Sequence, residues 1–152
     1  MADSKAHNHT DGILKGFDNL RVDNLITKHR DRFDLCVATH KDVSYLENEV
    51  VEDGLVTNRL AGWSFIKFSD VQRDEIYIHL IGTSIDDKTS WCTSQVVATD
   101  INRGFVQTKS GSLYELINES APQPSFELVM HVAATFRSWG MAKPLGMPTV
   151  FY

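Results

Sequence analysis

Hydrophobic and polar residues alternate in three short runs between Trp91 and Ile117, and two polar connections separate these runs. Alternate residues of a strand lie on the same face, so a period of two predicts β-strands. The connections are residues 100–104 and the dipeptide Ser110-Gly111, and a glycine in the second turn position supplies the positive φ of a two-residue hairpin. We therefore predict strands at residues 90–99, 105–109 and 112–117, joined as an antiparallel meander.

The predicted hairpin also implies a register. If Ser110-Gly111 forms its turn, Phe105 pairs with Leu116 and Gln107 pairs with Tyr114. Phe105, Tyr114 and Leu116 then share one face of the sheet. The opposite face carries Val106, Thr108, Leu113 and Glu115.

Two further apolar runs upstream, residues 63–68 and 76–85, have the same strand character and are joined by a polar turn. A third, residues 34–39, is short and apolar and is also interpreted as a strand. The sheet is thus expected to hold four to five strands.

Three segments have the spacing of amphipathic helices. The first spans residues 22–33, and the second spans residues 42–53 with Asp42 as its N-cap and Gly54 as its terminator. The third spans residues 126–139, with Ser125 as its cap and Gly140 at its end. The apolar positions expected to be buried are Val22, Leu25, Ile26, His29 and Phe33 in the first, Val43, Leu46 and Val50 in the second, and Phe126, Val129, Val132, Ala133 and Phe136 in the third.

These elements predict one α+β domain over residues 12–152, after a disordered N-terminus of residues 1–11. Its fold class is a small antiparallel β-meander of four to five strands with two or three helices packed against it. Residues 141–152 are apolar but contain two prolines, so we expect an extended tail that packs onto its own domain or onto a second copy.

Charge and composition narrow the range of functions that this sequence can have. The formal charge of −5 is spread along the chain without a basic stripe, which disfavours direct nucleic-acid binding. The sequence has neither an export signal nor an apolar run of the roughly 20 residues that span a bilayer, so we expect a cytoplasmic protein outside the membrane. In that compartment Cys36 and Cys92 are expected to be reduced, buried thiols.

Few residues form a recognisable catalytic pattern. The motif His7-Asn8-His9-Thr10-Asp11 matches the metal-binding HxHxD of metallo-β-lactamase-type hydrolases, but no folded strands precede it and Gly12 follows where a further histidine is expected. We therefore predict no metal and no cofactor. The weak catalytic candidates are His79, His131 and Cys92, where the two histidines would form an acid–base pair if the fold brought them together.

The aromatic residues are the strongest candidates for binding, because aromatic side chains dominate binding hot spots. An alternative is that they only complete the core. The set consists of Trp63, Trp91, Trp139, Phe151 and Tyr152.

One sheet segment resembles a known group of proteins. Its residues are Thr93-Ser94, Val96, Val106, Thr108, Ser110-Gly111-Ser112, Tyr114 and Leu116. This pattern resembles a segment of small uncharacterised proteins from bacteria and their mobile elements. The resemblance assigns no functional residue, but it implies a setting in which small proteins bind and block others, as immunity or anti-defence inhibitors do.

The leading hypothesis is therefore a non-enzymatic protein that binds another protein with a basic patch, and that also forms a homo-oligomer. A second hypothesis is a small enzyme or ligand-binding domain with a pocket around His79 and His131, to which Cys92 or Tyr114 contributes. A third is a sponge for a nucleotide or signal molecule. It would be indicated by a deep pocket that holds Trp91 or Trp139 together with Arg103 or Arg137.

Overall fold

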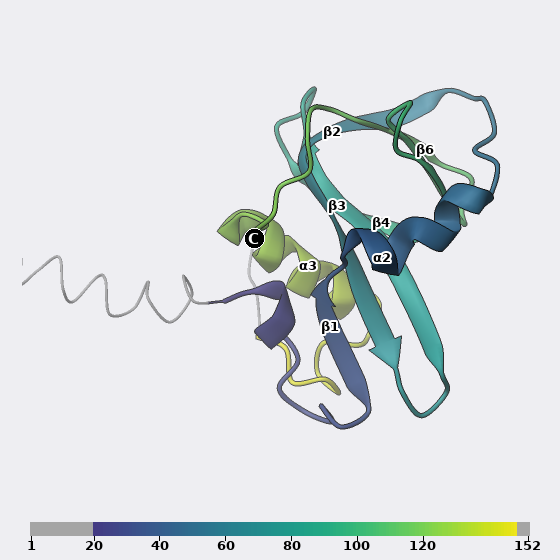
Figure 1. Ribbon diagram of the computed structural model, residues 1–152. Helices are drawn as coiled ribbons and strands as arrows, with labels where there is room; N and C mark the ends of the chain where they lie inside the picture. The colour runs from purple at the N-terminus through teal and green to yellow at the C-terminus, as the bar shows by residue number, and fades with distance from the viewer. Residues whose placement is uncertain (1–19, 149–152) are drawn as a thin grey trace, which may run out of the picture.

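The computed structural model describes residues 20–148, and most of its regular structure is strand (Figure 1). Two α-helices and two short 3₁₀ helices accompany the strands. In chain order the elements are η1 (Val22–Asn24), β1 (Phe33–Val37), α2 (His40–Val43), η2 (Ser44–Asn48), β2 (Val56–Asp70), β3 (Glu75–Ser84), β4 (Ser90–Asp100), β5 (Phe105–Thr108), β6 (Leu113–Leu116) and α3 (Phe126–Ser138). The α+β class predicted from the sequence is confirmed.

The sheet is closed, which corrects the prediction of an open meander. Within the described residues six strands follow one another in the order β1 to β6, and β6 also pairs with β2 in parallel. Strands β2 to β6 therefore form a five-stranded barrel, and β1 is an additional strand beside β2. The length of β2 explains this arrangement, because its first residues pair with β6 and its last residues pair with β1 and β3.

Strand β2 changes direction at a bulge, which separates its barrel half from its lower half. Its pairing with β3 shifts register between Ala61 and Ser64, and Gly62 in this stretch has φ +56°. Such bulges bend a strand and increase its twist. Beyond the bulge β2 and β3 continue as a hairpin that extends below the barrel (Figure 1).

The hairpin between β5 and β6 forms where the sequence predicts it, but in a different register. Phe105 pairs with Glu115 and Val106 with Tyr114, because the Thr108 N–H donates to the Ser112 carbonyl and three residues, 109–111, form the loop in place of a two-residue turn. A shift of one residue exchanges the two faces of a strand. Val106 and Thr108 therefore lie buried on the same face as Tyr114 and Leu116, in contrast to the predicted assignment.

Two of the predicted helices differ from the structure. The one predicted over residues 22–33 is not formed as an α-helix, and the one predicted over residues 42–53 has different bounds. In residues 22–33 the buried Leu25 and Ile26 follow only a 3₁₀ turn. The backbone N–H groups of Thr27 and Lys28 donate to the Leu145 carbonyl, and His29 has φ +59°, so the α-helical hydrogen-bond pattern is not formed. Phe33 instead begins strand β1.

The second predicted helix begins earlier and ends earlier than expected. Thr39 is the N-cap of α2, and the Asp42 carboxylate accepts from the Thr39 backbone N–H at 2.8 Å and from Lys67 Nζ at 2.9 Å. The 3₁₀ turn η2 ends at Asn48, before Gly54, and Val50 is 81% exposed.

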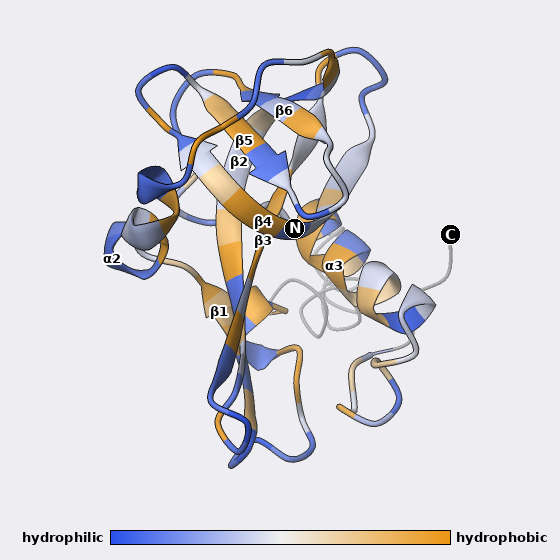
Figure 2. Ribbon diagram, turned by 90° about the vertical axis from the view of Figure 1, so that its right-hand side faces the viewer, coloured by the Kyte–Doolittle hydropathy of each residue, from blue (hydrophilic) through white to orange (hydrophobic). Residues whose placement is uncertain are grey.

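Helix α3 matches the prediction closely and runs alongside β3 and β4, outside the barrel (Figures 1 and 2). The Ser125 side chain accepts from the Leu128 N–H at 3.3 Å, which caps the helix, and Gly140 follows its end with φ +77°. In Figure 2 this helix carries both hydrophobic and hydrophilic colouring, as an amphipathic helix does. Phe126 differs from the prediction, since it is partly exposed whereas Leu128 is buried.

The buried side chains form two clusters on opposite faces of β2 and β3. We call the first the barrel cluster, and it contains Leu60, Trp63, Phe65, Ile78, Leu80, Val96, Val106, Tyr114 and Leu116, together with Val43 and Leu46 from α2 and η2. We call the second the α3 cluster. It contains Val22, Leu25, Ile26, Leu35, Ile66, Phe68, Ile81, five residues of α3, and Ala142, Leu145 and Met147.

The last described residues complete the α3 cluster. The prediction for the tail, residues 141–152, can be compared with the structure as far as residue 148. The Thr27 hydroxyl donates to the Gly146 carbonyl at 2.6 Å, next to the Leu145 carbonyl that accepts from two backbone N–H groups. Residues 141–148 thus pack on their own domain. The predictions for residues 1–11, including the HxHxD motif, and for Phe151 and Tyr152 lie outside the described residues.

Candidate functional site

A cavity of about 430 Å³ lies where the β2–β3 hairpin extends beyond the end of α3. We call it the aromatic pocket. The residues that line it come from β1 to β4, from the β2–β3 turn, and from α3 and the segment that follows. They are Phe33, Phe68, Asp70, Arg73, Glu75, Tyr77, His79, Ser94, Gln95, Phe136, Trp139 and Met141.

The strand register explains why these side chains meet. Asp70 is opposite Glu75, Phe68 is opposite Tyr77, and His79 is opposite Gln95 on the next strand. Residues separated by two positions along a strand share a face, so both strands present alternate residues to the same side. Helix α3 covers the part of this face that carries Ile66 and Ile81, and the remaining part forms the pocket.

Aromatic rings form most of the pocket wall. The Trp139 ring centroid lies 5.1 Å from that of His79 and 5.2 Å from that of Phe136, with tilted planes. Phe68 lies 5.5 Å from Phe136 and 6.3 Å from Tyr77. Trp139 remains 42% exposed, so part of its ring is accessible to a ligand. A concave aromatic surface of this kind binds flat, weakly polar groups.

His79 is held in one tautomer at the inner wall. Its Nδ1–H donates to the Thr93 carbonyl at 3.0 Å, which leaves Nε2 as the ring nitrogen that can accept a hydrogen bond. Burial lowers the pKa of His79 below its ordinary value, so the ring is neutral at pH 7. A neutral imidazole with a fixed donor side is suited to hydrogen bonding with a ligand.

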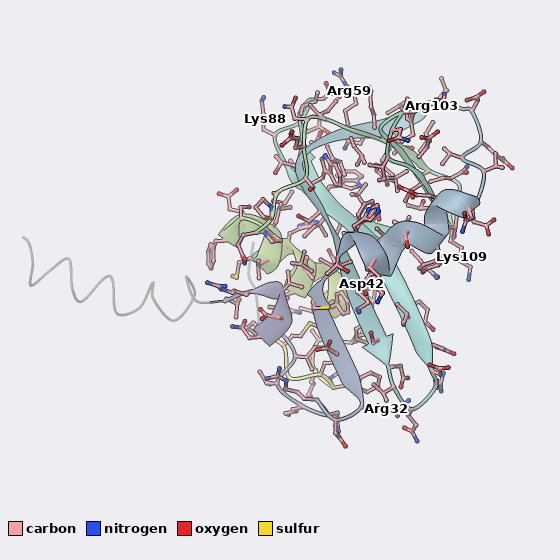
Figure 3. The ribbon with its side chains drawn as sticks, in the orientation of Figure 1. Arg32, Asp42, Arg59, Lys88, Arg103 and Lys109 are labelled. Carbon is pink, nitrogen blue, oxygen red and sulfur yellow. The ribbon has the colours of Figure 1, made fainter. Side chains whose placement is uncertain are left out.

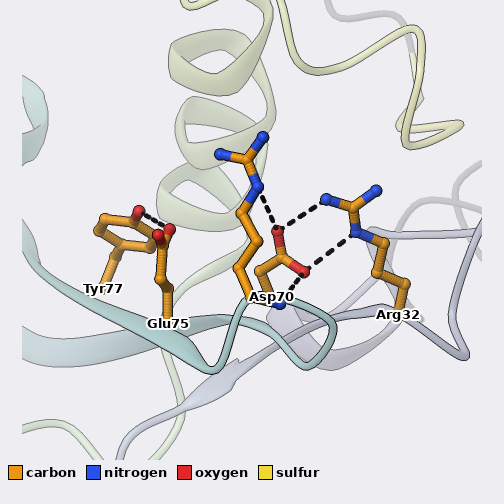
Figure 4. Close-up of polar contacts among 5 residues, drawn as sticks. Arg32, Asp70, Glu75 and Tyr77 are labelled. Atoms are coloured by element: carbon orange, nitrogen blue, oxygen red, sulfur yellow. Dashed lines mark hydrogen bonds and ion pairs between the residues drawn. The ribbon is translucent and has the colours of Figure 1, made fainter.

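Charged residues form one rim of the pocket (Figure 4). The Arg32 guanidinium binds Asp70 through two hydrogen bonds of 3.0 Å, and this pairing holds the pKa of Asp70 below its usual range. Arg73 Nε lies 4.0 Å from the same carboxylate. The Tyr77 hydroxyl donates to the Glu75 carboxylate, which raises the pKa of Tyr77. The rim therefore has two cations and two anions.

The aromatic pocket brings together two of the residues singled out from the sequence, His79 and Trp139. The other two tryptophans belong to the barrel cluster or pack against it. Trp63 is 8% exposed and donates from Nε1 to the Asn118 carbonyl, and Trp91 donates from Nε1 to the Tyr114 hydroxyl at 3.2 Å. These are the positions of core residues, as in the alternative interpretation of the aromatic set.

The other catalytic candidates do not line this pocket. His131 is on α3, and burial lowers its pKa. Burial raises the pKa of Cys92 to about 12, and it also raises that of Cys36, so neither free thiol is activated as a thiolate nucleophile. Within residues 20–148 no group of His, Cys, Asp and Glu side chains is arranged to hold a metal ion.

Sequence reasoning singled out only His79 and Trp139 and missed the other lining residues, among them Phe68, Tyr77, Arg73 and Gln95. The signal that indicates Phe68 and Tyr77 is the alternation in strands β2 and β3, combined with a short turn that brings their ends together. The register that places Gln95 opposite His79 depends on a bulge between β3 and β4, which has no clear signature in the sequence.

The cations of the chain are dispersed over its surface. Arg59, Lys88 and Arg103 lie at the barrel end of the molecule, whereas Arg32 lies at the opposite end (Figure 3). No helix in the described part of the chain combines the length and the apolar character that a membrane span requires.

No protein-family model, curated protein or solved structure matches this chain.

Proposed function

We propose that this protein is a non-enzymatic binding domain whose ligand occupies the aromatic pocket. One observation carries the proposal, namely that Phe68, Tyr77, His79, Phe136 and Trp139 surround a cavity of about 430 Å³. Small-molecule sites typically have volumes of roughly 300–1,000 Å³, with mostly apolar walls and a few polar groups. The pocket has both properties.

A binding role is favoured over catalysis by the state of the reactive side chains. His79 is a single histidine whose Nδ1 is bound to a backbone carbonyl, and neither Cys92 nor His131 lines the pocket beside it. A thiolate nucleophile needs a base within hydrogen-bond reach, and the two carboxylates of the pocket, Asp70 and Glu75, are already hydrogen-bonded to Arg32 and Tyr77. The pocket instead offers surface area and fixed hydrogen-bonding groups, which are sufficient to bind a ligand.

Calorimetric titration of the full chain with indole tests this proposal, since indole is a flat probe with one polar atom. We expect saturable binding that Trp139→Ala abolishes, because the variant removes the accessible wall of the pocket. Phe126→Ala is the matched control, since Phe126 is also a partly exposed aromatic residue of α3 but does not line the pocket. Equal indole binding by the wild type and Trp139→Ala would exclude the pocket as the site.

A second candidate function, the binding of another protein, is favoured by a different surface. Val50 and Leu55 are 81% and 95% exposed, and Glu49, Glu52 and Asp53 are exposed between and beside them. Exposed apolar residues among carboxylates are complementary to an apolar groove with a basic border. The inhibitor role that the sequence resemblance implies belongs to this candidate, and self-association and a cytoplasmic location stay predictions.

A comparison of variants in a pull-down tests this second candidate. We expect the tagged chain to recover a stoichiometric partner that Leu55→Asp loses. Val71→Asp is the control, because Val71 is also an exposed apolar residue, 68% exposed, but is located at the β2–β3 turn. A partner retained by Leu55→Asp, or lost equally in both variants, would rule out this surface.

A further inference from the structure

We propose that the aromatic pocket binds a planar heteroaromatic ring that carries an anionic group, either a phosphate or a carboxylate. The ring would lie against Trp139 and Phe68, and the anion would meet Arg73 at the rim. This inference rests on the proposed function, and it specifies the chemical class of the ligand.

The walls of the pocket are suited to a planar ring. The rings of Phe68, Phe136, His79 and Trp139 are 5.1 to 6.4 Å apart in successive contacts, so they form one continuous aromatic surface. A planar ring buries a large area against such a surface with little loss of conformational freedom. The cavity volume of about 430 Å³ leaves space for a fused ring and a substituent.

The walls of the pocket also contain polar groups. Gln95 and His79 both line the pocket; the Gln95 side-chain amide has no hydrogen-bond partner among residues 20–148, and the Nδ1–H bond of His79 leaves its Nε2 unprotonated. A purely hydrocarbon ring would cover these groups without replacing their hydrogen bonds to water, which is unfavourable. A heteroaromatic ring has donors and acceptors along its edge, and it can satisfy the amide and the imidazole together.

The charged side chains at the rim differ in their exposure to solvent. The Asp70 side chain is 8% exposed, whereas those of Arg32 and Arg73 are 36% and 68% exposed. Asp70 already receives two hydrogen bonds from Arg32, and Glu75 accepts one from Tyr77. Arg73 is therefore an additional guanidinium beside a carboxylate that is already paired. The four charges of the rim balance, but Arg73 is the more exposed of the two guanidiniums, so it is the cation that an anionic substituent can reach.

Two matched pairs of probes test the proposal by calorimetric titration of the full chain. The first pair is adenosine and adenosine monophosphate, and the second is indole and indole-3-acetate. In at least one pair we expect the anionic probe to bind roughly three- to tenfold more tightly than the neutral one. A gain of this size is what one exposed, charge-assisted hydrogen bond contributes to affinity. The difference should shrink in about 0.5 M salt, because exposed charges are screened. The pair with the larger gain identifies the phosphate or the carboxylate as the preferred anion.

Arg73→Gln and Arg103→Gln separate the specific contact from the overall charge. Arg103 is a matched control, because it is 62% exposed and lies 3.7 Å from Asp100 but does not line the pocket. We expect Arg73→Gln to remove the gain of the anionic probes without changing the affinity of the neutral ones, and Arg103→Gln to leave the gain intact.

The outcomes distinguish this inference from the proposed function. Neutral and anionic probes of equal affinity in both pairs, or a gain that persists in Arg73→Gln, would overturn the inference while the pocket remains a binding site. The absence of any Trp139-dependent binding by all four probes would overturn both.

Discussion

The two hydrophobic clusters of this protein differ in how completely they are closed. The barrel cluster is enclosed by β2 to β6 together with α2 and η2, and its buried tryptophan Trp63 donates a hydrogen bond inside the protein. The α3 cluster is covered by α3 together with residues 22–26 and 142–147, and α3 ends before the β2–β3 hairpin does. Its last aromatic residues consequently line a pocket, and Trp139 remains partly exposed.

This difference indicates a division of roles along the same two strands. Side chains of β2 and β3 that face the barrel serve stability, since nearly all of their surface is used in packing. The opposite face of the two strands contributes to the core at one end and to the pocket wall at the other. Its residues lie between Ile66 and Asp70 on β2 and between Glu75 and His79 on β3. The comparison predicts that substitutions in the barrel affect stability, and that substitutions in the pocket affect binding.

The largest expected contrast is between two tryptophans. Trp63→Ala should lower the free energy of unfolding by about 3–5 kcal/mol, because it leaves a cavity in the barrel cluster. Trp139→Ala should cost only roughly 1–2 kcal/mol, since its ring is 42% exposed, yet it should abolish indole binding. Urea denaturation of both variants measures the two costs. Similar costs for the two substitutions would refute the division between the clusters.

The next contrast concerns close packing between β2 and β3. A Cβ at Gly82 would lie 2.9 Å from the Leu60 Cβ and 3.3 Å from the Trp63 Cβ, so Gly82→Ala should destabilise the barrel by about 1–3 kcal/mol. Gly54→Ala is the control, because a Cβ there meets nothing within 4 Å. Thermal unfolding of both variants provides the measurement, and an unchanged melting temperature in Gly82→Ala would show that the barrel is loosely packed.

Helix caps sharpen the comparison at a smaller scale. Ser125 caps α3, which forms one wall of the pocket, and Thr39 caps α2 beside the barrel cluster. Replacement of either cap residue by alanine should lower the free energy of unfolding by about 1 kcal/mol. Only Ser125→Ala should also weaken indole binding, because Phe136 and Trp139 depend on α3 for their position. Equal indole affinities in the two variants would argue against α3 as a wall that positions the ligand.

The smallest expected effect is a pH dependence centred on the pocket. The folded state lowers the pKa of His79, so the unfolded chain binds a proton first as the pH falls below about 6.5. Stability from this group is therefore complete above that pH and is lost progressively as the pH falls below it. Denaturation of His79→Gln at several pH values should show a shallower loss than the wild type. His131→Gln should also reduce the slope of stability against pH, since the pKa of His131 is lowered as well. If this slope is unchanged in His79→Gln, the pH dependence arises from other residues.

The sequence predicted the elements of the fold better than their assembly. Alternation located the strands of the sheet, and the cap and terminal glycine of α3 were both identified. The closure of the barrel was missed because it depends on the parallel pairing of Val56 to Leu60 with β6, between segments more than fifty residues apart. The hairpin register was wrong because the loop has three residues in place of two, a difference that turn propensity alone does not resolve.

The candidate site was predicted only in part, for related reasons. His79 was singled out as a histidine among apolar neighbours, and Trp139 as an aromatic residue at the end of a helix. Their proximity depends on how α3 lies across the sheet, which no local pattern encodes. Arg73 carried no signal, because a single arginine in a polar turn has the composition of any exposed loop.

The central claim is that the barrel serves as a scaffold and that the aromatic pocket binds the ligand. Its most direct test is chemical-shift mapping by NMR during an indole titration. We expect the largest shifts at Phe68, Tyr77, His79 and the Trp139 indole N–H, with the Trp63 and Trp91 indole signals unchanged. Shifts centred on Trp63 or Trp91, or no saturable shift at any of these residues, would contradict this claim.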